Sequence, residues 1–155
     1  EITAMNVCDL IRGSDVVVDA MDNWKTRFDL NSGCVECRIP LVHAGIYSLS
    51  GQMTTIVPGE GPCLRCIIPK PPPEIRPFPV VGATPGLFAM LQTMEVFKLI
   101  LRLGKPLVGR LLLFSGDDMS FNTVQVSRNP DCPICSRTQQ VPRSLIQGHS
   151  QLDIP

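Results

Sequence analysis

The sequence is poor in aromatic residues and has no excess of positive charge. Aromatic residues make up 5% of its 155 residues, and 14 basic side chains balance 14 acidic ones. Proteins that bind nucleic acid usually carry a basic surplus and aromatic rings that stack on bases. We therefore expect no nucleic-acid partner.

Long apolar runs and a signal-peptide pattern are also absent. No run approaches the roughly 18 apolar residues that cross a bilayer, so we expect no membrane association. Apolar residues are 44% and charged residues 18%, which is typical of one globular domain. The first residue is Glu1, and residues 1–13 already read as an amphipathic segment leading into a strand. We therefore expect the chain to be part of a larger protein.

The first half of the sequence alternates strand and helix patterns. The β-branched run from Val16 to Val18 is typical of a buried strand in a parallel sheet. Asp22 and Asn23 are both able to cap the helix after this strand. This half predicts a sheet that begins parallel and ends mixed. Its elements are a strand over 16–20, a helix over 24–37, strands over 41–46 and 52–57, and a turn at Ser50-Gly51.

The second half is dominated by prolines and then by one long helix. Eight prolines between residues 58 and 82 exclude a regular helix or central strand there. Thr84 as N-cap and Pro85 at the first helical position predict a helix that ends before Gly104. Its broad apolar surface predicts burial on several sides, partly in an oligomer interface. A hairpin over 111–114 and 121–126 comes next, and residues 137–155 are expected to form a polar tail or linker.

Six of the seven cysteines form three C-x-x-C pairs. Two of these pairs lie in loops and predict a closed, four-coordinate structural zinc site; unliganded thiols or disulfides are the alternative. The ligands would be Cys63, Cys66, Cys132 and Cys135. Cys34 and Cys37 lie near the end of a helix, where one buried and one surface cysteine are expected, and Cys8 is expected in the core. Metal-binding cysteines favour a cytoplasmic protein.

An ordered series of motifs over residues 1–136 resembles the MoeB/ThiF/HesA family. Ubiquitin-activating enzymes share the core of this family. The motifs are Asp19-Ala-Met-Asp22-Asn23-Trp-Lys-Thr-Arg27, Asn31, Ile39-Pro-Leu-Val42, Gly51-Gln52, Pro62-Cys-Leu-Arg-Cys66, Leu91-Gln-Thr-Met-Glu95, Gly104-Lys-Pro106 and Arg128-Asn-Pro-Asp-Cys-Pro-Ile-Cys135. The resemblance implies a Rossmann-like, three-layer α/β fold with a mixed sheet. Residues 1–136 would be the C-terminal part of a ThiF-type domain.

The resemblance also implies an activity. Members of the family adenylate the C-terminal glycine of a ubiquitin-like protein, consuming ATP and Mg²⁺ and releasing pyrophosphate. The implied partner is a sulfur-carrier protein of molybdopterin or thiamine biosynthesis, or of related thiolation, and members are usually homodimers. The competing hypothesis is a non-catalytic, zinc-stapled interaction module.

Individual residues take their expected roles from the same resemblance. Asp22 matches the family's essential aspartate, which acts with Mg²⁺ at the phosphates. Asn23 would shape the nucleotide pocket or cap the helix. Arg27 would contact substrate or form a structural salt bridge. Asp19 is expected behind the site, and His43 is expected to be a satisfied core histidine.

The sequence departs from the family in two places. The segment from Pro69 to Gly82 has no cysteine, although many members carry one in this crossover loop; this favours adenylation without covalent transfer. No glycine-rich phosphate loop is present, since Gly59-Glu-Gly61 lacks the third glycine. In the family that loop lies upstream of residue 1, so we expect this chain alone to bind ATP poorly.

Overall fold

The computed structural model describes residues 1–73 and 76–137. The elements have the order α1 (Val7–Ile11), β1 (Val17–Asp19), α2 (Trp24–Cys37), β2 (Leu41–Tyr47), β3 (Ser50–Ile56), α3 (Leu64–Ile67), α4 (Ala83–Leu101), β4 (Arg110–Ser115) and β5 (Ser120–Gln125). None of the helices in these two ranges has the length and apolar character of a membrane span. The predicted polar tail lies, from residue 138 onward, outside the described residues.

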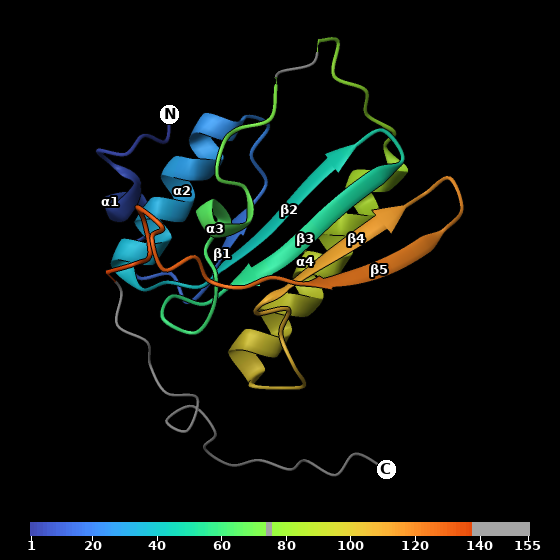
Figure 1. Ribbon diagram of the computed structural model, residues 1–155. Helices are drawn as coiled ribbons and strands as arrows, with labels where there is room; N and C mark the ends of the chain where they lie inside the picture. Colours follow the sequence, from blue (N-terminus) through green and yellow to red (C-terminus); the bar gives the residue numbers. More distant parts are fainter. Residues whose placement is uncertain (74–75, 138–155) are drawn as a thin grey trace.

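Five strands form one mixed sheet in the order β1-β2-β3-β4-β5. The first pair is parallel and the other three are antiparallel, which confirms the predicted mixed sheet. Helices α1 and α2 cover one face, and α4 crosses the other (Figure 1). The arrangement is the three-layer α/β fold expected from the sequence.

Strand β2 explains why the sheet is covered on both faces. Successive side chains of a strand point to opposite faces. Leu41 packs with Leu30 of α2 in one core, whereas Val42 and Ala44 pack with Phe88 of α4 in the other. The apolar sequence of β2 is therefore used on both sides, and both helical layers are anchored to this strand.

Three local predictions are corrected. The β2–β3 turn lies at Ser48 and Leu49, because Ser50 already pairs with Tyr47 and the backbone of Ser48 is left-handed with φ 53°. Helix α4 begins at Ala83, so Thr84 is inside it and is not its N-cap. The Thr84 hydroxyl instead donates to the Ser48 carbonyl at 2.8 Å. The third correction is the single helical turn α3, which forms within the proline-rich segment.

Helix α4 turns two polar side chains, Gln92 and Glu95, toward the sheet. Gln92 and Glu95 are buried, whereas Met90, Met94 and Phe97 are 65%, 59% and 52% exposed. Polar side chains usually mark the solvent face of a helix, but here they meet backbone groups at strand ends and loops. Burial of this helix on several sides is therefore not observed among the described residues. The homodimer stays a prediction.

Glu95 satisfies two buried donors. Its Oε2 accepts a hydrogen bond from the Leu107 amide at 2.8 Å and another from the Thr55 hydroxyl. Its Oε1 pairs with Lys98. One carboxylate therefore fixes the chain after α4 against β3.

We expect Glu95→Ala to lower the free energy of unfolding by about 3 kcal/mol, because it leaves two buried donors without an acceptor. Glu36→Ala, which removes an exposed glutamate from α2, should change it by less than about 0.5 kcal/mol. Urea unfolding of the full-length protein measures both. Equal effects of the two substitutions would contradict the orientation of α4 in which Glu95 is buried against the sheet.

Candidate functional site

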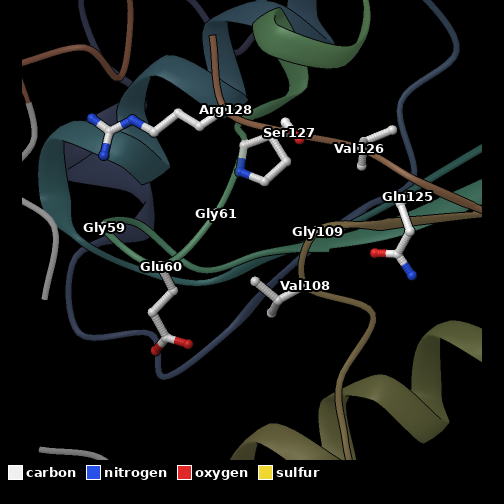
Figure 2. A pocket seen from close by; sticks show the side chains of 10 residues that line it. Gly59, Glu60, Gly61, Val108, Gly109, Gln125, Val126, Ser127 and Arg128 are labelled. Atoms are coloured by element: carbon white, nitrogen blue, oxygen red, sulfur yellow. The ribbon is translucent and has the colours of Figure 1, made fainter. Parts of the chain in front are cut away.

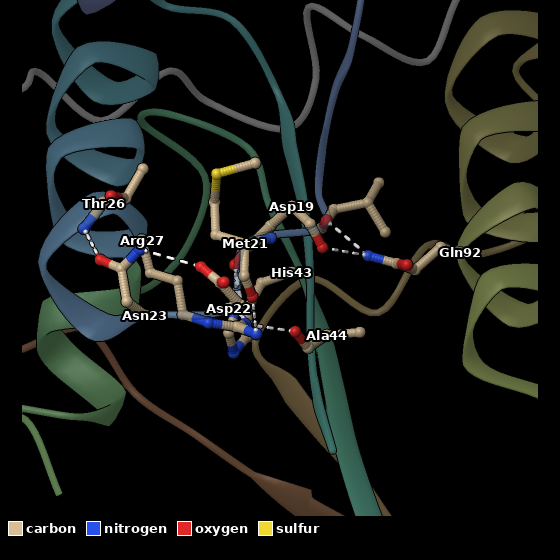
Figure 3. A network of polar contacts seen from close by, with 10 residues as sticks. Asp19, Met21, Asp22, Asn23, Thr26, Arg27, His43, Ala44 and Gln92 are labelled. Carbon is tan, nitrogen blue, oxygen red and sulfur yellow. Dashed lines mark hydrogen bonds and ion pairs between the residues drawn. The ribbon is translucent and has the colours of Figure 1, made fainter. Parts of the chain in front are cut away.

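Asp22 lies just beyond the carboxyl end of β1, where its side chain is exposed. Its Oδ1 accepts a hydrogen bond from Asn23 Nδ2 at 3.0 Å. Asn23 Oδ1 accepts in turn from the Thr26 amide at 2.8 Å, so Asn23 is the N-cap of α2 (Figure 3). Of the two polar residues able to cap the helix, Asn23 does so, and the Asp22 carboxylate accepts a hydrogen bond from this capping side chain.

A buried carboxylate, Asp19, holds the end of β1 in place. It is 2% exposed. Its Oδ1 accepts from the Met21 amide at 2.9 Å, and its Oδ2 accepts from Arg27 Nη1 at 3.1 Å and His43 Nδ1 at 2.6 Å. Gln92 Nε2 donates to the Asp19 carbonyl at 3.0 Å from the opposite face of the sheet. Asp19 therefore accepts hydrogen bonds from side chains of α2, β2 and α4 at the same time.

Arg27 binds inward rather than toward solvent. Besides Asp19, its guanidinium donates to the carbonyls of Ala44 and Met21, and it stacks 5.5 Å from the Trp24 ring centroid. These contacts are those of the structural salt bridge that the sequence allowed. A substrate contact by Arg27 stays a prediction.

His43 is neutral. Burial lowers its pKa even though the adjacent Asp19 carboxylate acts in the opposite direction. The neutral ring donates from Nδ1 to Asp19, and its buried Nε2 has no partner among the described residues. The prediction of a core histidine is thus right about burial, but only one ring nitrogen is satisfied.

We expect Arg27→Ala to lower the free energy of unfolding by about 3–5 kcal/mol, because it leaves the Asp19 charge buried without its cation. Lys25→Ala is the matched control, since Lys25 pairs with Asp29 on the exposed side of the same helix. Chemical denaturation of the full-length protein should show almost no change for Lys25→Ala. If both variants unfolded at similar denaturant concentrations, the ion pair between Arg27 and Asp19 would contribute little to stability.

Four cysteine sulfurs gather where α3 meets the segment after β5. The Sγ–Sγ distances are 4.0 Å for Cys63–Cys66, 3.6 Å for Cys63–Cys132 and 3.4 Å for Cys66–Cys135. All four sulfurs lie within 4.8 Å of one another. Four sulfurs held tetrahedrally at about 2.3 Å from a metal would lie about 3.8 Å apart. The cluster could therefore hold a metal ion, as its sequence spacing predicted.

The protonation of these thiols depends on their surroundings. Burial raises the pKa of Cys63 and raises that of Cys66 to about 11. Burial acts in the same direction on Cys132, but hydrogen bonds from the Cys135 and Ile134 amides outweigh it and lower the Cys132 pKa to about 7. A metal would have to displace protons from the cluster, so its affinity would decrease as the pH is lowered.

Asn31 links the cysteine cluster to α2, the helix that follows Asp22. It is fully buried in α2, and its Oδ1 accepts from the Leu64 amide of α3 at 2.9 Å. On the other side of the cluster, the Asn129 amide donates to Cys66 Sγ at 3.4 Å. No role for Asn31 alone was predicted from the sequence. The sequence feature that could have indicated this role is a strongly polar side chain on an otherwise buried face of the helix.

A surface cleft lies beside the turn that carries Cys63 (Figure 2). Its volume is about 300 Å³, and residues 59–62, 108–109 and 125–128 line it. Asp22, Asn23 and Arg27 are not among them. The cleft borders the Cys63 turn instead, and the exposed Asp22 lies outside it at the end of β1.

The sequence matches the ThiF family over residues 1–134. The chain belongs to the ThiF family. It is 47% identical over 135 residues to the SAMP-activating enzyme E1 of Haloferax volcanii, covering 84% of this chain and 50% of that protein. It is 40% identical over 144 residues to the sulfur carrier protein adenylyltransferase of Thermus thermophilus, covering 86% and 53%. The chain thus spans about half the length of these curated relatives.

Solved structures support the fold independently. The chain resembles E. coli MccB in complex with MccA-N7isoASN, with a TM-score of 0.72 over 85% of this chain and 43% of that one. Sequence identity is 19%, so this similarity concerns the fold alone. Protein HesA of Leptolyngbya boryana is a further relative in sequence, 39% identical over 99% of this chain and 57% of its own length.

Proposed function

We propose that the protein to which this chain belongs adenylates the C-terminal glycine of a ubiquitin-like sulfur-carrier protein. The observation that carries the proposal is the exposed Asp22 carboxylate at the carboxyl end of a parallel strand, in a member of the ThiF family. Ligands of open α/β sheets bind at that end of the strands. Two relatives, named as an E1 and a carrier adenylyltransferase, support the same reaction class.

In the proposed reaction the terminal carboxylate of the carrier attacks the α-phosphate of ATP. A carboxyl–phosphate bond forms, the bond to pyrophosphate breaks, and an acyl-adenylate remains. Asp22 would hold Mg²⁺, which offsets negative charge on the phosphates when bound. Asn23 positions the Asp22 carboxylate through its 3.0 Å hydrogen bond. One carboxylate oxygen is thereby oriented, and the other has no partner among the described residues.

The chain supplies only part of such a site. A glycine-rich phosphate loop is not found in its sequence. We propose that the loop and the cationic side chains that hold the triphosphate come from the part of the relatives' length that this chain does not span. This chain alone should then bind ATP weakly, as the sequence predicted.

The absence of cysteine between Pro69 and Gly82 bears on the fate of the activated carrier. Without a thiol there, this segment cannot take the carrier as a thioester or acyl-disulfide. We propose that the reaction at this site ends at the acyl-adenylate. A homodimer in the cytoplasm remains our prediction, and the exposed apolar face of α4 supports the homodimer.

Asp22→Ala should lower ATP–pyrophosphate exchange by at least about 100-fold in the full-length protein supplied with its carrier, because charge at the phosphates loses its metal ligand. Asp117→Ala is the control, since Asp117 is an exposed acid in the distant β4–β5 turn. Its exchange rate should match that of the unmodified protein. Undiminished exchange by Asp22→Ala would remove Asp22 from the reaction.

The same assay decides between the two functional classes. If the unmodified full-length protein catalysed no exchange with any sulfur carrier encoded beside it, the non-catalytic interaction module would replace the enzyme. That alternative draws on the missing phosphate loop and the missing crossover cysteine.

For the cysteine cluster we propose a structural zinc ion. Four thiolates with tetrahedral spacing and no position for water are typical of structural zinc. The two pairs come from segments on either side of α4, β4 and β5. Zinc would therefore tie the end of the described chain to α3 and, through Asn31, to α2.

The full-length protein should contain about one zinc ion per chain at this cluster, and Cys132→Ser should lose it. Cys8→Ser, outside the cluster, should retain the metal. Because protons compete with zinc for buried thiolates, acidification from about pH 8 to about pH 5 should release the ion. Elemental analysis and a colorimetric chelator measure these quantities. Full zinc content in Cys132→Ser would disprove the assignment.

A further inference from the structure

Cys8 and Cys37 lie next to each other although they are 29 positions apart in the sequence. Cys8 is in α1 and Cys37 is the last residue of α2, and the two helices lie side by side (Figure 1). Their sulfurs are 2.6 Å apart, and both residues are partly exposed. The prediction that Cys8 lies in the core is therefore wrong.

The contact results from close packing of the two helices. Val7 and Ile11 of α1 are buried in the core shared with α2. Gly33 of α2 allows this approach, because a Cβ at that position would lie 2.6 Å from the Val7 methyl carbons. Cys8 Sγ also lies 3.9 Å from the Gly33 carbonyl. The position of Cys8 is thus set by the packing of α1 as a whole.

The spacing distinguishes this pair from the metal cluster. Sulfurs that share a tetrahedral metal lie about 3.8 Å apart, and those of the cluster are 3.4–4.0 Å apart. At 2.6 Å, Cys8 and Cys37 are too close to hold a metal between them. Within residues 1–73 and 76–137, the four cluster cysteines are the one group of three or more close metal ligands.

We propose that Cys8 and Cys37 form a reversible disulfide that ties α1 to the C-terminal end of α2. The oxidant is a low-molecular-weight disulfide such as oxidised glutathione. One protein thiolate attacks a sulfur of that disulfide and releases one glutathione thiolate, which takes up a proton. The second protein thiolate then attacks the mixed disulfide and releases the second glutathione. Two protein thiols are oxidised and one small disulfide is reduced to two thiols.

The pair has the properties of a crosslink and not of a thiol-transfer site. Catalytic redox cysteines have a lowered pKa. The pKa of Cys8 is instead raised to about 11, because its thiol shares a hydrogen bond with Cys37 and is partly desolvated. Cys34, one turn earlier in α2, is completely buried, and burial raises its pKa to about 12. It is therefore out of reach of the exchange.

The crosslink would close a loop that contains β1, the Asp22 turn and all of α2. A crosslink stabilises a fold mainly by restricting the unfolded chain. It would act on the segment that carries the site residues without touching them. The inference does not rest on the proposed adenylation.

The test uses the full-length, metal-loaded protein in mixtures of reduced and oxidised glutathione. After acid quenching and alkylation, cleavage after Glu36 separates Cys34 from Cys37 for mass spectrometry. Expected in the oxidising mixture is a crosslinked pair of peptides bearing Cys8 and Cys37, with Cys34 and the four cluster cysteines unlinked. Cys8→Ser and Cys37→Ser should each abolish the crosslink.

Thermal unfolding supplies the second measurement. The oxidised protein should melt about 10 °C above the reduced one, and the Cys8→Ser/Cys37→Ser double variant should lose this difference. Persistence of both residues as free thiols in excess oxidised glutathione would overturn the proposal. So would pairing of Cys37 with Cys34, or glutathione remaining on Cys8 with no crosslink.

Discussion

The architecture around the candidate site depends on one buried negative charge. The Asp19 carboxylate is nearly inaccessible to water, and an isolated charge in such a place would be strongly unfavourable. The fold meets this requirement with a cation from α2, a ring nitrogen from β2 and a backbone amide from its own chain. Each of these groups must be in position at the same time. The charge therefore fixes the register of helix and strands at the edge where β1 ends.

Much of this could be predicted because the sequence signals are local. The extent of α2 was predicted correctly from its cap and periodicity, and the mixed sheet from the order of strands. The tetrathiolate cluster was predicted because two C-x-x-C turns determine their own geometry. Asp22 was found at a strand end for the same reason, since a strand with a capping residue after it places the turn between them.

The remaining features depend on contacts between distant segments, which local patterns do not contain. The orientation of α4 was not predicted, because its buried polar residues are satisfied by backbone groups of β1, β2 and the chain before β4. The inward direction of Arg27 depends on Asp19 and Ala44 lying beside it in space. The Cys8–Cys37 contact likewise requires Gly33 to let α1 approach α2. Sequence spacing alone gives no measure of these distances.

The hydrogen bonds from Asp19 and Arg27 to Met21 also fix the backbone that leads into Asp22. The Met21 amide is bound by the Asp19 carboxylate, and the Met21 carbonyl is bound by Arg27, so the peptide groups that lead into Asp22 are fixed from both directions. This turn loses its conformational entropy when the protein folds, so binding of a ligand would not have to include that cost. The Asp22 carboxylate is therefore mounted on backbone that is already fixed before any ligand binds.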